Sequence, residues 1–103
     1  MERFDNNTQL LREMRHEVTV KMRGASLKEV TGMIFQTMRK QIFREIEQPI
    51  IQMEAQEVYF EQVDVHTTTE RFMFLFWPRE KKEYTVTARI VVKVKYLELE
   101  EAK

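Results

Sequence analysis

The chain has 103 residues, enough for one domain and too few for two. Lysine and arginine balance aspartate and glutamate at 17 each, so no general attraction to nucleic acid or to an anionic membrane is expected. The absence of cysteine excludes disulfides, thiol catalysis and cysteine-ligated zinc. It also fits a reducing cytosol, so we expect a cytoplasmic protein. No apolar run reaches the length of a membrane span, so direct membrane insertion is not expected.

The first 15 residues are mostly polar and are expected to form a partly ordered N-terminal extension. Thr8 is a candidate cap for a short helix that would contain Leu10, Leu11 and Met14. The alternative is a frayed terminus, because chain ends are often untethered.

Residues 16–23 alternate between apolar and polar side chains, which predicts a half-buried strand ending at Gly24. Ser26 followed by Glu29 forms a capping box, which predicts the start of a helix. Helical spacing then places one apolar stripe toward the sheet, and Pro49 is expected to stop the helix. The stripe consists of Leu27, Val30, Ile34, Met38, Ile42 and Ile46.

Residues 50–65 are strand-like, but their apolar positions change parity near Glu57. This change predicts either a β-bulge or a break into two short strands. Residues 66–69 fit a connector, although their threonines fit a continuous strand equally well.

Residues 72–77 are apolar on both parities, whereas residues 84–96 alternate cleanly. The charged, proline-started segment 78–83 between them is expected to be the loop of a hairpin. We therefore expect one domain over residues 16–99 and a frayed tail over residues 100–103. The predicted fold class is α+β, with one long helix on an antiparallel sheet of three to four long strands, in the order strand, helix, strand, strand, strand.

One helix covers only one face of such a sheet, so the other face is expected to meet a second copy of the chain. We predict a homo-oligomer, either a dimer or a larger closed ring. Which face of segment 72–77 meets the helix is left open. The predicted interface consists of Met73, Leu75, Trp77, Val91 and Leu97.

Carboxylates recur along residues 54–64, and histidines occur at two positions in the chain. Acid–base catalysis would need two carboxylates in a cleft, and a zinc site would need more ligands than His66 and Asp64. A solvated strand face accounts for both patterns, so no catalytic residue, metal site or cofactor is predicted. The carboxylates considered are Glu54, Glu57, Glu61 and Asp64.

Basic side chains next to the aromatic run invite comparison with a surface that stacks bases and binds phosphates. Glu80 and Glu83 neutralise much of this charge, and the aromatic signature of the commonest RNA-binding module is missing. We therefore expect no nucleic-acid binding and interpret the charges as protection of a sheet edge. The basic residues are Arg79, Lys81, Lys82, Arg89, Lys93 and Lys95.

Three blocks of sequence resemble a family of small bacterial proteins, domain-of-unknown-function family 4312. They are residues 52–58, the aromatic run 72–80 that contains Trp77-Pro78-Arg79, and residues 84–92 that begin Tyr-Thr-Val-Thr. The resemblance covers residues 17–99. It implies genes beside those of membrane proteins and of enzymes that break down sugar acids or amino sugars, and hence a possible membrane-protein partner. The order of elements also looks dodecin-like, but Trp77 does not match the flavin-stacking tryptophan of dodecins, and a fold does not carry a function.

The leading hypothesis is a non-catalytic, oligomeric accessory or structural protein of a bacterial uptake and catabolic system. The alternative is a protein that binds a small molecule, such as a sugar acid, a flavin or a nucleotide, in an aromatic pocket. A third hypothesis is an enzyme that uses Glu54, Glu57 or His66. The predicted aromatic pocket consists of Phe72, Phe74, Trp77, Tyr84 and Tyr96.

Overall fold

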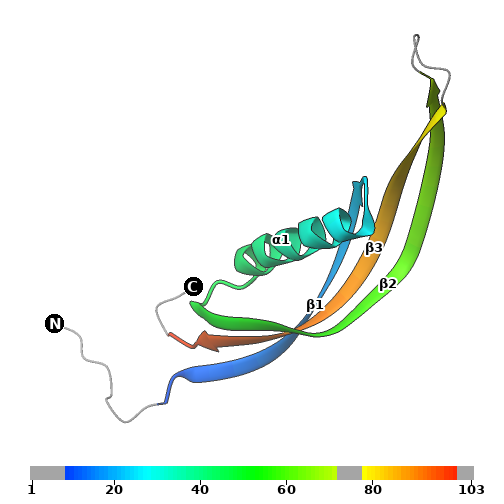
Figure 1. Ribbon diagram of the computed structural model, residues 1–103. Helices are drawn as coiled ribbons and strands as arrows, with labels where there is room; N and C mark the ends of the chain where they lie inside the picture. Colours follow the sequence, from blue (N-terminus) through cyan, green and yellow to red (C-terminus); the bar gives the residue numbers. More distant parts are fainter. Residues whose placement is uncertain (1–8, 72–77, 100–103) are drawn as a thin grey trace.

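The computed structural model describes residues 9–71 and 78–99, except for the side chains of residues 70, 71, 78 and 79. Its elements are β1 (Leu11–Gly24), α1 (Leu27–Glu45), β2 (Ile50–Arg71) and β3 (Pro78–Leu97). The strands form one antiparallel sheet in the order β1-β3-β2. The sheet is curved, and α1 lies on its concave side (Figure 1). The predicted fold class is confirmed, with three strands in the described part of the chain.

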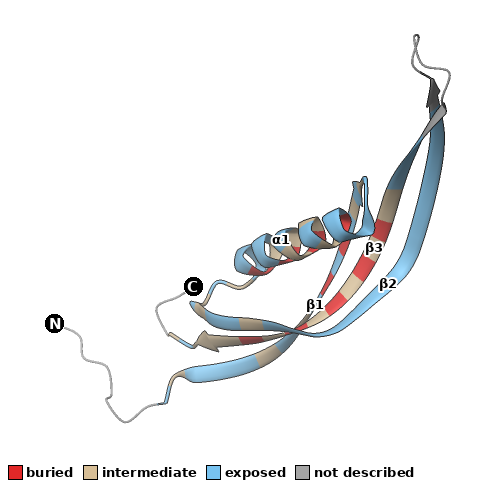
Figure 2. Ribbon diagram, viewed as in Figure 1, coloured by how far each residue is buried: buried red, intermediate tan, exposed pale blue. Residues whose placement is uncertain are grey.

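The core lies between α1 and the concave face of β1 and β3 (Figure 2). Alternation along β3 places every second side chain under the helix, as the sequence predicts. The helix contributes Val30, Ile34, Met38 and Ile42 to this core. The two ends of the predicted stripe differ, since Leu27 is 42% exposed and Ile46 lies just past the helix as its C-cap. The core residues of the sheet are Val18, Val20, Val86, Ala88, Ile90, Val92 and Val94.

The start of α1 confirms the predicted capping box. The backbone N–H of Glu29 donates to Ser26 Oγ at 3.1 Å, and the Glu29 carboxylate accepts from the N–H of Ala25 at 3.1 Å. Gly24 allows β1 to end close against the first turn, because a Cβ there would lie 3.0 Å from Val30 Cγ2. The helix ends at Glu45, four residues before Pro49.

Two expectations about local structure are wrong. No helix forms around Leu10, Leu11 and Met14, because β1 already begins at Leu11 and pairs with the C-terminal end of β3. Segment 78–83 is not a loop but the first part of β3, and it pairs with residues 66–71 of β2. Charged side chains are compatible with a strand when both of its faces are open to water, and a proline is tolerated as the first residue of a strand.

Residues 72–77 lie outside the described residues, so the predictions about their strand character and about which face meets the helix concern a segment that is not described. The expected N-terminal segment before Gln9 and the tail after Leu99 also lie outside the described residues.

The molecule is long and narrow, with principal extents of 76 × 27 × 17 Å. Its radius of gyration is 21.0 Å, whereas a compact domain of this length has a value of about 13 Å. The cause is visible in Figure 1, where β2 and β3 continue well beyond the C-terminal end of β1 and the start of α1. We call this two-stranded part, residues 66–71 paired with residues 78–83, the extended arm. A large share of the chain therefore lies away from the single core.

Candidate functional site

The concave face of β2 carries an apolar row that is produced by β-bulges. The register of β2 against β3 shifts between Ile50 and Gln52, between Ala55 and Glu57, and between Phe60 and Gln62. Each shift adds one residue to β2 and so reverses which parity faces the helix side. As a result, apolar positions of both parities lie opposite the even-numbered, core-facing residues of β3. We call the row formed by Ala55, Val58, Phe60, Val63 and Val65 the β2 stripe.

The β2 stripe is exposed because α1 is too narrow to cover it. A helix with its side chains is about 10–12 Å across, whereas three strands at their usual spacing span about 14 Å. The helix packs on β1 and β3. Val58, Phe60 and Val63 each remain 42% exposed and Val65 remains 52% exposed. Figure 2 shows β2 exposed along most of its length beside the buried residues of β3.

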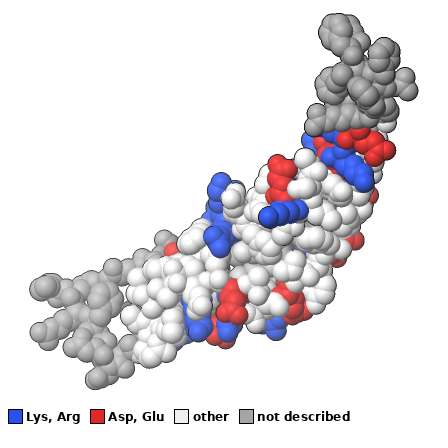
Figure 3. Space-filling view, viewed as in Figure 1, with Lys and Arg blue, Asp and Glu red and all other residues white. Residues whose placement is uncertain are grey.

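The outward face of α1 is basic. Lys28, Arg39, Lys40 and Arg44 are exposed on the helix, and Lys and Arg side chains stand out from it in Figure 3. Phe43 lies among them and is 59% exposed. It is two residues from Glu45, which contacts His16 of β1 at 3.1 Å. Two residues correspond to about 200° around a helix, so Phe43 points away from the sheet, on the same outward side of α1 as Arg39 four residues earlier.

The convex face of the sheet is covered by ion pairs. Arg15 Nη2 lies 2.8 Å from Glu57 Oε2, and Arg89 lies between Glu17, at 3.5 Å, and Glu61, at 3.4 Å. Lys93 Nζ lies 3.9 Å from Glu13. Acidic and basic side chains are close together along the lower margin of Figure 3. This face is compatible with water and does not require a cover.

Tyr59 belongs to the same network. Its hydroxyl donates to the Glu57 carboxylate, and the Arg89 guanidinium lies 4.5 Å from the centre of its ring. The hydrogen bond from Tyr59, followed by the one from Arg15, lowers the pKa of Glu57, while the same hydrogen bond to Glu57 raises the pKa of Tyr59. Glu57 is therefore held as an acceptor in a structural network.

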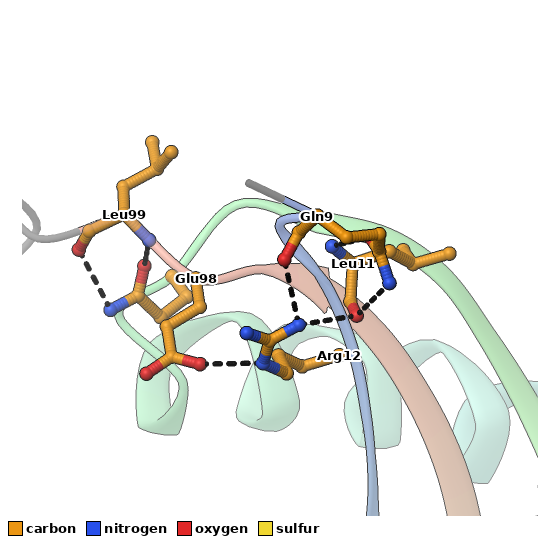
Figure 4. Close-up of polar contacts among 6 residues, drawn as sticks. Gln9, Leu11, Arg12, Glu98 and Leu99 are labelled. Atoms are coloured by element: carbon orange, nitrogen blue, oxygen red, sulfur yellow. Dashed lines mark hydrogen bonds and ion pairs between the residues drawn. The ribbon is translucent and has the colours of Figure 1, made fainter. Parts of the chain in front are cut away.

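One end of the sheet is tied together by polar contacts (Figure 4). Arg12 Nε donates to Glu98 Oε2 at 2.8 Å, and Arg12 Nη1 donates to the carbonyl oxygen of Gln9 at 2.9 Å. The backbone N–H of Leu99 donates to Gln48 Oε1 at 2.9 Å. These contacts join the start of β1, the end of β3 and the segment after α1, which fixes the sheet end opposite the extended arm.

The structure does not bring the two described residues of the predicted aromatic pocket together. Tyr84 and Tyr96 both belong to β3, twelve residues apart, which corresponds to about 40 Å along a strand. The other three members, Phe72, Phe74 and Trp77, lie outside the described residues.

Of the predicted interface, Val91 and Leu97 are described, whereas Met73, Leu75 and Trp77 are not. Val91 is paired with Glu17 on one side and with Glu57 on the other, so it lies within the charged convex face. Leu97 is partly buried, and its backbone N–H donates to the carbonyl oxygen of Pro49 at 2.9 Å.

The candidate chemical groups of β2 lie on the convex side. Glu57 and Glu61 are in ion pairs with arginines, and Asp64 accepts a hydrogen bond from Gln62 at 3.0 Å. His66 is exposed, and its register partner on β3 is Glu83. Across residues 9–71 and 78–99, no group of histidine and acidic side chains has an arrangement that could hold a metal ion.

The basic residues considered for phosphate binding are partly engaged elsewhere. Arg89 and Lys93 contact glutamates on the convex face, as described above. Lys81, Lys82 and Lys95 lie along β3. Within the described part of the chain, no helix is long and apolar enough to cross a membrane.

A family model described as domain of unknown function DUF4312 matches residues 14–97. The chain belongs to this family. The match spans all of α1, β2 and β3 and residues 14–24 of β1, so the elements described above form the DUF4312 domain. The comparison with curated proteins and the comparison with solved structures found no match.

Residue parity alone misses the β2 stripe, although the sequence contains a signal for it. Apolar residues recur in pairs two residues apart, and the pairs recur every five residues: Met53 and Ala55, then Val58 and Phe60, then Val63 and Val65. Polar doublets separate the pairs, and a bulge lies at each doublet. A repeat of five residues consists of two alternation periods of two residues each and one extra residue at a bulge. It predicts a continuous apolar row on a repeatedly bulged strand.

Proposed function

We propose that this DUF4312 chain is a non-catalytic, self-associating accessory or structural protein, and that its elongated sheet is stabilised by contacts with other copies. The observation that carries the proposal is the shape of the molecule. A radius of gyration of 21.0 Å means that much of the chain lies far from the core formed by α1, β1 and β3. A two-stranded ribbon is at best marginally stable alone in water, so the extended arm of β2 and β3 needs further packing.

The state of the carboxylates on β2 supports a structural role over a catalytic one. Glu57 and Glu61 are held by Arg15 and Arg89 on an open, convex face. Acid–base catalysis instead needs carboxyl groups with separated pKa values in a site that excludes water. A role in a bacterial uptake and catabolic system, with a membrane-protein partner, is part of the proposal through the family resemblance.

Thermal unfolding at several protein concentrations tests this proposal. If folding is coupled to association, mass action raises the Tm as the concentration increases. We expect a steady rise of Tm, followed by circular dichroism, over about a hundredfold range of concentration. A Tm that stays constant over this range would contradict the proposal, because a monomeric fold gains nothing from added copies.

A further inference from the structure

We propose that the β2 stripe of a second copy of the chain packs against the β2 stripe of the first, on the part of the concave face that α1 leaves uncovered. The two stripes then cover each other. This inference rests on the proposed self-association and names the surface that carries it. The partner is a second copy of this chain, and the interface is the concave face of β2 together with the neighbouring flank of α1.

The bulges keep the apolar residues of the β2 stripe on one face of the strand, which indicates that the sequence encodes this row. Without them, strict alternation would move Val58 and Phe60 to the face opposite that of Met53 and Ala55. The register shifts before Glu57 and before Gln62 return each apolar pair to the concave face. Within the described residues, this arrangement adds little to the chain's own core, since the β2 stripe remains exposed. A covering surface from outside the chain accounts for it.

The thickness of α1 matches the spacing between two packed sheets. Two packed sheets lie about 10 Å apart, and a helix with its side chains is about as thick. A partner's β2 placed on the β2 stripe therefore lies beside α1, at the same height above the sheet, and covers the area that the helix leaves open. With a twofold axis along the strands, the β2 of each copy covers the uncovered area of the other.

The chemistry of the β2 stripe selects the second copy as its occupant. The residues of β2 that lie opposite core-facing residues of β3 carry no charge from Ile50 to Val65. A matching surface must be equally long and uncharged. The outward face of α1 is basic and does not match. Among the described residues, the other exposed large apolar side chains are spread over separate positions: Leu11, Leu27, Phe43, Ile51 and Tyr59.

The same placement also brings opposite charges together. The convex side of β2 carries Glu54 and Asp64, next to the paired Glu57 and Glu61. In the dimer, this acidic row of one copy lies beside the basic outward face of α1 of the other copy. The exposed cations Arg39 and Lys40 thus face a complementary seam, which steers the two copies into one arrangement.

Matched lysine substitutions on the two faces of β2 test the interface by light scattering. Val63→Lys and, separately, Val65→Lys place a charge on the β2 stripe, and Gln62→Lys places the same charge on the convex face next to Asp64. Circular dichroism shows whether each variant is folded. We expect folded Val63→Lys and Val65→Lys to dissociate to the 12.6 kDa mass of one chain, while Gln62→Lys keeps the wild-type mass.

Cross-linking supplies a second readout that does not depend on weakening the assembly. The chain has no cysteine, so Val63→Cys and Gln62→Cys each introduce a single thiol. A short bis-maleimide should link two copies through position 63 and not through position 62.

The outcomes separate this inference from the proposed function. A wild type with the mass of one chain contradicts self-association itself. A wild-type oligomer that keeps its mass in both lysine variants, and links no better through position 63 than through position 62, overturns the β2 stripe as the interface and leaves self-association standing.

Discussion

At the scale of single residues, the described polar side chains mostly serve the fold. Ser26 caps α1, and its role is readable from the sequence because a capping box depends on residues only three positions apart. The contacts among Tyr59, Glu57, Arg15 and Arg89 are not readable in this way. They join three strands, and their formation depends on the register set by the bulges.

Tyr59→Phe removes the hydroxyl that donates to Glu57, and the pKa of Glu57 should rise toward its ordinary value. Because the folded pKa of Glu57 is lowered, its contribution to stability is present above the ordinary value of 4.5 and is lost as the pH falls through the folded pKa. The substitution should therefore reduce the loss of stability on acidification. An NMR titration of the Glu57 carboxyl carbon measures the shift, with Tyr84→Phe as a control on the other face. An unchanged Glu57 titration in Tyr59→Phe would show that the Tyr59 hydroxyl does not lower the pKa of Glu57 and that the neighbouring arginines do.

Ser26→Ala removes the oxygen that accepts from the N–H of Glu29. The loss of this cap should lower the free energy of unfolding by about 1 kcal/mol. Urea unfolding at one fixed protein concentration measures it. Equal stability of the variant and the wild type would mean that the cap contributes nothing to the helix.

At the scale of elements, α1 and β3 follow from periodicity, and β2 does not. Helical spacing identifies the buried residues of α1, and strict alternation over residues 84–96 identifies those of β3, because both stretches keep one regular period. Parity counting fails for β2 because each bulge inserts a residue, so residues on one face do not keep one parity. The charged start of β3 fails for another reason, since a ribbon open to water on both faces has no apolar pattern to detect.

The orientation of α1 is tested by a pair of substitutions. Ile34 is fully buried between the helix and the sheet, so Ile34→Ala should cost roughly 2–5 kcal/mol of unfolding free energy. Arg39→Ala, on the outward face, should change the stability by no more than about 0.5 kcal/mol, because an exposed charge at the rim of an interface affects mainly the rate of association. Denaturant unfolding of both variants decides the matter, and a larger loss for Arg39→Ala than for Ile34→Ala would mean that the helix is rotated.

At the scale of the whole molecule, the single helix α1 covers only part of a sheet that is wider and longer than the helix. The core beneath α1 is complete, while the concave face of β2 and the arm beyond Gly24 are uncovered. The sequence predicts an uncovered apolar surface, because the pattern contains one long helix. It places that surface on Met73, Leu75, Trp77, Val91 and Leu97. The described structure shows an uncovered apolar surface on β2, which parity counting does not locate because of the bulges.

Sedimentation equilibrium of the wild-type chain at micromolar concentration tests the central claim most directly. The association of β2 stripes predicts a single folded species with at least twice the 12.6 kDa mass of one chain. It further predicts that the Val63→Lys variant sediments with the mass of one chain under the same conditions. A folded wild type that sediments as a single 12.6 kDa chain throughout the micromolar range would contradict the account.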